Sequence, residues 1–254
     1  MMKFVGRDRE IKKLNTLYQD EGFQFVVIYG RRRVGKTMLI NEFLKGKRSA
    51  YYMAVEGTAK ENLTGISKAL LTEGASDFYM PEFSDFESLL LYIDHLCKNS
   101  DGQERLVIAI DEFPYLAASY PAISSMLQSH IDQCWKNSNL FLILCGSSMS
   151  FMEEQVLGYK SPLYGRRTAQ FKLHPFSYFE AKEMLSEFST EEQAVLYGVT
   201  GGIPEYLSRI RSNQSMDDNI KELFFDESGR LFDEPGNFLN QELQDPSSYH
   251  SIIT

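Results

Sequence analysis

The sequence is poor in cysteine and has no long hydrophobic run. Its three cysteines, Cys97, Cys134 and Cys145, form no CxxC pair, and no histidine lies at metal-ligand spacing from them. We interpret them as reduced thiols, which favours a cytosolic compartment. No apolar run approaches the ~18 residues that a membrane span needs, and the polar N-terminus lacks the apolar core of a signal peptide. The sequence therefore predicts a soluble, cytoplasmic protein with no membrane partner.

An excess of positive charge is also absent, since the formal net charge is −9. This excludes a core that binds nucleic acid through overall positive charge. The chain is nevertheless rich in aromatic residues, with 18 Phe and 14 Tyr, which indicates a folded protein rather than a disordered one. Its 254 residues suffice for one large domain, or for a core and a smaller lid.

Short apolar runs alternate with helical patterns over the first two thirds of the chain. We predict strands at 23–29, 50–55, 106–110, 140–145 and 169–173, and helices at 36–45, 61–72, 84–98 and 121–136. Almost continuous apolar strands are typical of a parallel sheet that is covered on both faces. Alternation of strands and helices indicates right-handed crossovers. The predicted fold class is therefore α/β, a parallel sheet sandwiched by helices.

The pattern changes beyond about Pro175, where strong strand signals end. Helices are predicted at 177–188, 190–198, 203–211 and 216–225. We interpret this part as a small helical lid domain beside the core. The predicted domains are a core at 1–175, a lid at 176–240 and a connector at 241–254.

A phosphate-binding motif joins the first predicted strand to the first predicted helix. Gly30-Arg31-Arg32-Arg33-Val34-Gly35-Lys36-Thr37 fits G-x-x-x-x-G-K-[ST], and Met38 continues into the helix. Such a loop turns its backbone N–H groups toward phosphates at the positive end of a helix. Lys36 is predicted to reach the terminal phosphates and Thr37 to bind Mg²⁺. Two interpretations of Arg31, Arg32 and Arg33 stay open: they form a solvated loop crest, or they pair with acidic groups.

An acidic pair, Asp111 and Glu112, follows the third predicted strand. The carboxyl ends of strands are where open α/β sheets bind ligands. Adjacent carboxylates repel in a pocket of low dielectric constant, and a divalent cation relieves that repulsion. We predict that Asp111 holds Mg²⁺ and that Glu112 activates water as general base.

Two further polar positions are candidates for contacts with the reacting phosphate. Ser147, with Ser148 as second choice, follows the fourth strand and is predicted to orient water or sense phosphate. Its alternative is an ordinary serine-rich turn. Arg166 or Arg167 is predicted to stabilise charge on the transferred phosphoryl group, within the chain or from a neighbouring subunit. Their alternative is a surface pair.

Six motifs occur in order along the chain: Phe4-Val5-Gly6-Arg7-Asp8-Arg9-Glu10, Tyr29 to Thr37, Ile110-Asp111-Glu112-Phe113, Cys145-Gly146-Ser147-Ser148, Leu173-His174-Pro175-Phe176 and Thr200-Gly201-Gly202-Ile203-Pro204. Together they resemble the archaeal-type ATPase family of the STAND group, relatives of AAA+ proteins. The resemblance covers almost the whole chain. It implies an ASCE-type P-loop sheet, in which the acidic-pair strand is not adjacent in sequence to the phosphate-loop strand, and it implies ATP or ADP as ligand.

The resemblance also implies roles that the residues alone do not. Val5, Gly6 and Arg7 would line the adenine pocket, and Gly202 and Pro204 would contact the nucleotide from the lid. Members of this family are thought to be ATP-driven switches. They usually continue into a winged-helix domain and a nuclease-like domain, and residues 245–250 resemble the start of the former. We therefore expect a truncated chain, whose DNA contacts, if any, belong to the missing domains.

Three functions follow from these patterns. The first is a Mg²⁺-dependent ATP hydrolase with possible nucleotide-dependent self-association. The second is a regulatory module that binds ATP or ADP without appreciable turnover. The third, a small-molecule kinase, ranks last because we find neither an acceptor pocket nor a mobile lid motif for it.

Overall fold

The computed structural model describes residues 4–71, 83–98, 104–234 and 236. The chain divides into two compact units, Met1–His174 and Pro175–Thr254. Each unit is described by itself. The predicted connector at 241–254, with the proposed start of a winged helix, lies outside the described residues.

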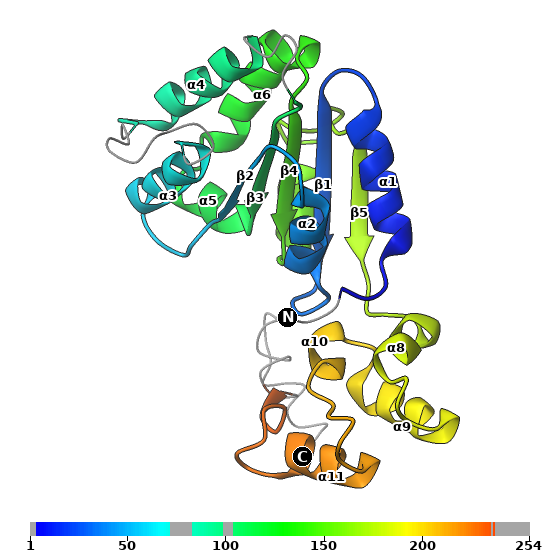
Figure 1. Cartoon of the computed structure of the whole chain (residues 1–254). Helices are drawn as coiled ribbons and strands as arrows, with labels where there is room; N and C mark the ends of the chain where they lie inside the picture. Colours follow the sequence, from blue (N-terminus) through cyan, green and yellow to red (C-terminus); the bar gives the residue numbers. More distant parts are fainter. Residues whose placement is uncertain (1–3, 72–82, 99–103, 235, 237–254) are drawn as a thin grey trace. The chain divides into compact units, whose positions relative to one another are not determined.

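The first unit is built on a five-stranded parallel sheet (Figure 1). Its strands are β1 (Gln24–Gly30), β2 (Ser49–Met53), β3 (Val107–Asp111), β4 (Phe141–Gly146) and β5 (Ala169–Leu173). Their order in space is β2-β3-β4-β1-β5, and every pairing is parallel. The predicted fold class is confirmed. Strand β4 lies between β1, which leads to the phosphate loop, and β3, which leads to the acidic pair. Because the three strands are parallel, the loop and the acidic pair lie at the same, carboxyl-terminal edge of the sheet.

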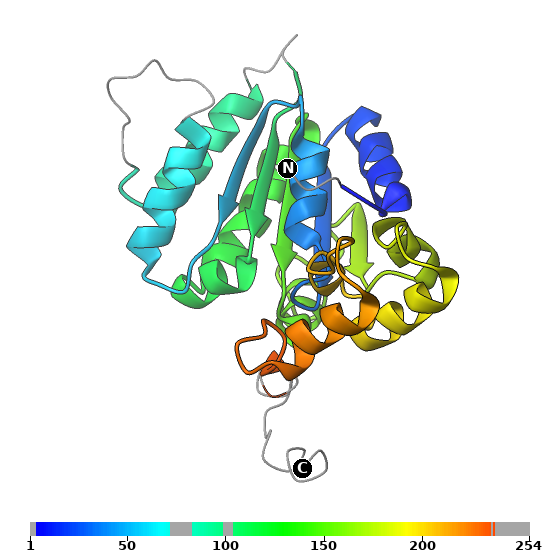
Figure 2. The ribbon, with the colours of Figure 1, turned by 60° about the horizontal axis from the view of Figure 1, so that its bottom comes forward.

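Helices cover both faces of this sheet, as Figures 1 and 2 show. One face carries α1 (Asp8–Gln19) and α2 (Lys36–Leu44), and the other carries α3 (Ala59–Leu71), α4 (Phe86–Lys98), α5 (Phe113–Ser119) and α6 (Ile123–Gln133). Alternate residues of β1 serve the two layers, because Val26 and Ile28 pack with α1 and α2 while Phe25 and Val27 pack with the other layer. This explains why β1 is buried along its whole length.

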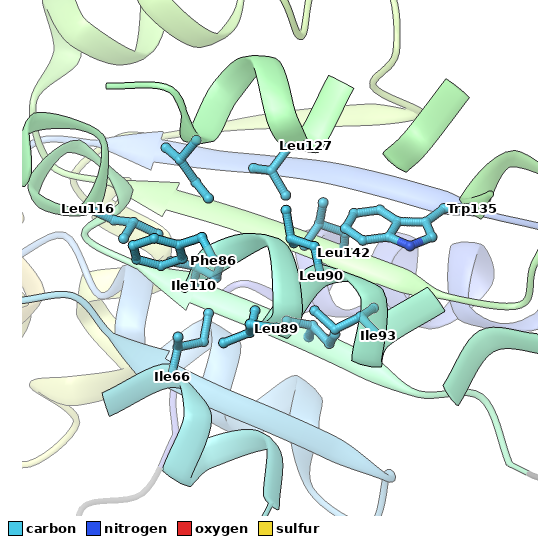
Figure 3. Close-up of a pocket in the computed structure, with 12 residues that line it drawn as sticks. Ile66, Phe86, Leu89, Leu90, Ile93, Ile110, Leu116, Leu127, Trp135 and Leu142 are labelled. Carbon is cyan, nitrogen blue, oxygen red and sulfur yellow. The ribbon is translucent and has the colours of Figure 1, made fainter. Parts of the chain in front are cut away.

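The larger core lies between the sheet and α3 to α6. Figure 3 shows its centre, where side chains of α4 such as Phe86 and Leu89 face Ile110 of β3 and Leu142 of β4. Ile66, Leu116 and Leu127 enter from α3, α5 and α6. The small cavity among these side chains is lined by apolar residues only, as expected of a close-packed interior. We assign it to the core.

Several helix boundaries differ from the sequence prediction. Helix α4 begins two residues after the predicted 84 and is capped by Asp85, whose Oδ1 accepts from the backbone N–H of Ser88 at 2.7 Å. Helix α5 was not predicted, because Pro114 and the short length hide its periodicity. The helix predicted at 121–136 is α6 followed by the 3₁₀ turn η1 (Trp135–Asn137). Helix α7 (Met149–Phe151) and the π-helical turn η2 (Met152–Val156) follow β4.

The second unit is helical in its described part. It holds α8 (Tyr178–Met184), α9 (Thr190–Thr200), α10 (Pro204–Leu207), α11 (Met216–Ile220) and the π-helical turn η3 (Lys221–Phe225). Ser177 with Glu180, and Ser189 with Glu192, form reciprocal capping boxes that start α8 and α9. Helix α10 is shorter than the predicted 203–211. Among the helices that the structure describes, none has the length and apolarity to span a membrane.

Candidate functional site

The candidate site lies at the carboxyl edge of the sheet, where three central strands end. Strand β1 ends at Gly30, β3 at Asp111 and β4 at Gly146. Because neighbouring parallel strands end at one edge, the phosphate loop, the acidic pair and the serine turn come together there. The predicted convergence of these motifs is found in the structure.

The phosphate loop depends on two glycines for different reasons. At Gly30 a Cβ would lie 2.4 Å from the carbonyl oxygen of Leu173, so the loop packs against the end of β5 only without a side chain. Gly35 adopts a left-handed conformation, φ 90°, as the N-cap of α2. Arg33 also has a positive φ of 69°. A non-glycine residue in this region is strained and is typical of functional loops.

Lys36 begins α2 and points back into its own loop. Its ammonium is buried and donates hydrogen bonds to the carbonyls of Gly30 at 2.9 Å and Arg31 at 2.8 Å. Burial lowers the pKa of Lys36, and the carboxylates of Asp111 and Glu112 oppose that shift. The cation is therefore held in the middle of the loop, facing the acidic pair.

Thr37 and Asp111 are in direct contact. The Thr37 hydroxyl donates to Asp111 Oδ2 at 2.6 Å, and the Asp111 carboxylate is fully buried. Because its O–H donates to the carboxylate, the hydroxyl keeps its oxygen lone pairs available for another partner. Two hard oxygen donors thus lie side by side at the start of α2.

Glu112 is aimed at the end of β4. Its φ of 50° is unusual for a residue with a side chain, and it forms the N-cap of α5. Its Oε2 accepts from the backbone N–H of Ser147 at 3.1 Å and from the Ser147 hydroxyl at 2.9 Å. Ser148, the second choice, instead is the N-cap of α7. The structure therefore brings Ser147 and Glu112 together.

Two tyrosines belong to the site that no sequence motif indicated. The Tyr51 hydroxyl on β2 donates to Asp111 Oδ2 at 3.0 Å. Burial, and then the charge of Asp111, raise the pKa of Tyr51, so its phenol stays protonated and acts as a donor. Tyr115 on α5 lies 3.1 Å from the Nη2 of Arg32, which donates to its hydroxyl. Only the pairing of β2 with β3 and the position of α5 disclose these contacts.

The remaining loop residues divide by exposure. Arg31 and Arg32 are exposed, which fits the loop-crest interpretation, and Arg32 donates to the phenolic hydroxyl of Tyr115. Val34 is buried in the core below the loop, and Met38 is 42% exposed on α2. Val34 therefore anchors the loop in the core, while Arg31, Arg32 and Met38 lie at its exposed surface.

Arg7 braces the phosphate loop from the N-terminal segment. Gly6 and Arg7 both have positive φ, 68° and 65°. The buried Arg7 side chain donates to the carbonyl of Val34 at 3.0 Å and to that of His174 at 2.5 Å. Its guanidinium thus binds protein backbone. The predicted adenine contact of Val5, Gly6 and Arg7 remains a proposal.

Arg166 and Arg167 lie at the opposite end of the sheet. They precede Ala169 of β5, which pairs with Val26, whereas Leu173 pairs with Gly30. Four residues of strand separate the two ends by roughly 13 Å. Arg166 also binds Asp132, its Nη2 donating to Oδ2 at 2.6 Å. This corrects the prediction that Arg166 acts on a phosphate within its own chain.

Gly202 and Pro204 lie in the second unit, in a tight turn between α9 and α10. Gly202 has φ 67°, and a Cβ there would lie 2.4 Å from the carbonyl oxygen of Phe176. The backbone N–H of Phe176 donates to the Gly202 carbonyl at 2.8 Å. Pro204 is buried at the first position of α10. The close approach of the Phe176 backbone explains why glycine occupies position 202. The predicted nucleotide contact of Gly202 and Pro204 remains a proposal.

The donor set fits a phosphate ligand with Mg²⁺. The loop combines a buried ammonium with a helix N-terminus, the groups that bind polyphosphate. Across the described ranges, no cluster of three or more His, Cys, Asp or Glu could enclose a metal ion. Mg²⁺ does not need one, since it binds one or two protein oxygens and completes its shell with water and phosphate. Thr37 and Asp111 are such a pair.

Comparison with known proteins gives a family and a fold. A model of the family described as "ATPase domain predominantly from Archaea" matches residues 4–210. An uncharacterized protein of Methanocaldococcus jannaschii is 34% identical over 252 residues, which are 98% of this chain and 53% of that protein. The chain thus spans about half the length of this relative.

Two solved structures share the fold at low sequence identity. A Walker-type ATPase of Pyrococcus abyssi has a TM-score of 0.62 and 18% identity, over 86% of this chain and 72% of that one. The ORC2 protein of Aeropyrum pernix in its ADP form has a TM-score of 0.60 and 16% identity, over 82% and 63%. The likeness extends to most of the chain and establishes its architecture.

Proposed function

Because this chain belongs to the family of ATPase domains found predominantly in Archaea, we propose that it hydrolyses ATP with Mg²⁺ and acts as a nucleotide-driven switch of the STAND type. One observation carries the proposal. Thr37, Asp111, Glu112 and Ser147 form a continuous hydrogen-bonded chain beside the buried Lys36 ammonium. That chain contains the groups that phosphoryl transfer to water requires.

Phosphate binding would be the work of the loop and the helix behind it. Backbone N–H groups from Gly30 to Thr37 and the positive end of α2 would surround the phosphates. Lys36 would exchange its bonds to the Gly30 and Arg31 carbonyls for phosphate oxygens. The ADP form of the similar Aeropyrum pernix protein supports an adenine nucleotide as ligand.

Thr37 and Asp111 would hold the cation. Mg²⁺, when bound, supplies charge neutralisation for the phosphates and for the neighbouring carboxylates. The Thr37 oxygen would be a direct ligand, because its O–H points at Asp111 and leaves the lone pairs free to face the cation. Asp111 would contribute through its charge and through ordered water.

Glu112 would take the proton from the attacking water. Ser147 donates twice to Oε2 and so fixes the carboxylate, and we assign proton acceptance to the other oxygen, Oε1. Ser147 is thus proposed as a positioning residue for the general base.

Phosphate release from ATP tests this proposal. The chain is expected to release phosphate with Mg²⁺ and to stop when EDTA removes the cation, because Thr37 and Asp111 then have nothing to hold against the phosphates. The measurement is a coupled assay for inorganic phosphate with ATP, and GTP serves as comparison. No release at any cation concentration, with ATP still bound, would exclude hydrolysis.

That last result would favour a second function, a regulatory module that retains nucleotide. The lid role of the second unit and the contacts of Gly202 and Pro204 belong to this proposal. Slower hydrogen exchange at the 202–204 turn on adding ADP would support the switch.

We also propose that ATP promotes self-association. Arg166 is engaged by Asp132, so Arg167 is the better candidate to reach a phosphate on a neighbouring subunit. The mass measured by light scattering is expected to increase with a non-hydrolysable ATP analogue and not with ADP. Arg167→Ala should lose this increase, while Lys160→Ala, in the same exposed segment, should keep it. An unchanged mass in every nucleotide state contradicts the proposal.

A further inference from the structure

The strongest unassigned contact of the site is made by Tyr51. Its hydroxyl donates to Asp111 Oδ2 at 3.0 Å, the oxygen that also accepts from Thr37 at 2.6 Å. We infer that Tyr51 is a positioning residue of the cation site, which holds Asp111 in the orientation that lets Thr37 and Asp111 serve a divalent cation. The inference rests on the proposed binding of nucleotide with Mg²⁺.

The argument begins with the burial of Asp111. Its carboxylate has no exposed surface, so each oxygen needs donors from the protein. Oδ1 accepts from the backbone N–H of Glu112 at 2.9 Å, and Oδ2 accepts from Thr37 and Tyr51. Donors at both oxygens restrict the rotation of the carboxyl plane. Removing the Tyr51 hydroxyl takes away one of the two hydroxyl donors to Oδ2.

The orientation of Asp111 in turn decides what Thr37 can do. The Thr37 hydroxyl presents its lone pairs to a cation when its O–H points away from that cation, and its bond to Asp111 Oδ2 holds the O–H in one direction. If Asp111 rotates, that proton loses its acceptor and the hydroxyl turns. Tyr51 therefore acts through Asp111 on Thr37 and does not itself touch the cation.

The position of Tyr51 on the sheet suits this task. Strand β2 is at the edge of the sheet and pairs with β3, with Tyr51 opposite Ala109 and Met53 opposite Asp111. The Tyr51 ring packs with the core on the α2 side of the sheet. The phenol and the Thr37 hydroxyl thus meet at the same oxygen, Asp111 Oδ2, on the face of the sheet that carries α2.

The test compares cation binding by Tyr51→Phe and by the unsubstituted chain, both with ADP. Mn²⁺ is the probe, and its affinity for the ADP complex is measured by electron paramagnetic resonance. Loss of an outer hydrogen bond to a metal ligand weakens metal binding by about 10- to 100-fold, and we expect a loss in that range. ADP affinity in EDTA should stay unchanged, because Asp111 contacts phosphate only through the cation.

Tyr52→Phe is the matched control. Tyr52 is the next residue of β2, points to the other face, and donates to Asn62 Oδ1 at 2.8 Å. Its loss also removes one phenolic hydrogen bond, so thermal stability should fall while Mn²⁺ affinity stays unchanged. Tyr51→Met, which fills the space with a flexible apolar chain, should repeat the result of Tyr51→Phe.

Each other outcome overturns the inference. Unchanged Mn²⁺ affinity in Tyr51→Phe means that Asp111 keeps its orientation without the phenol. Equal losses in Tyr51→Phe and Tyr52→Phe mean that both tyrosines act through stability alone. If the unsubstituted chain binds ADP but no Mn²⁺, the proposed cation site fails, and with it the role of Tyr51.

Discussion

Lys36→Ala is expected to lower the affinity of the chain for ADP and ATP by about 100-fold or more, because it removes two charge-assisted hydrogen bonds to phosphate oxygens. Lys36 is only 6% exposed, and its ammonium is already in the loop, so no rearrangement of the backbone is needed to offer it to a ligand. Isothermal titration with each nucleotide measures the effect.

Burial makes the size of this loss plausible. A cation in a buried loop interacts with a phosphate more strongly than one in water, since less solvent screens the pair. Lys36 also faces Asp111 and Glu112, whose carboxylates favour its charged form. Without it, the acidic pair would repel the incoming phosphates.

Lys45→Ala is the control for this experiment. Lys45 is the C-cap of the same helix, its side chain is 68% exposed, and it pairs with Glu42. An exposed pair of this kind contributes little, so nucleotide affinity should stay unchanged. A Lys36→Ala protein that is folded by circular dichroism and binds ADP as well as the unsubstituted chain contradicts the assignment of the loop.

Glu112→Gln is expected to keep nucleotide affinity and to lower the rate of phosphate release by about 100-fold or more, the usual contribution of a general base. The amide has nearly the same shape, and its oxygen still accepts from Ser147. It has no basic oxygen for the proton of the attacking water. The site should therefore bind its ligand and fail at the proton-transfer step.

Single-turnover kinetics separate the binding of ATP from the release of phosphate. The Glu112→Gln protein should show normal ATP binding followed by almost no release of phosphate. Glu42→Gln, on α2 and away from the carboxyl edge, should leave both steps intact. If Glu112→Gln releases phosphate at the rate of the unsubstituted chain, then another group activates water, or the attack of water needs no general base.

Much of the fold could be predicted because its signals are local. Each predicted strand begins and ends within two residues of the observed one, since buried parallel strands read as continuous apolar runs. The phosphate loop was equally clear, because its glycines, Lys36 and Thr37 are consecutive. Helix boundaries were less accurate. The cap at Asp85 and the short α5 depend on side-chain bonds that periodicity does not reveal.

The sequence by itself determined the chemistry that the site can offer, a loop lysine, a hydroxyl and a carboxylate pair, because these groups occupy consecutive positions after buried strands. Only the tertiary structure decided which side chains support them. Tyr51 reaches Asp111 through the pairing of β2 with β3, and Ser147 reaches Glu112 because β4 ends beside β3. Likewise, Arg166 precedes the start of β5 and binds Asp132 at the end of the sheet away from the phosphate loop. Contacts between residues distant in the chain follow from strand order, and no local pattern encodes that order.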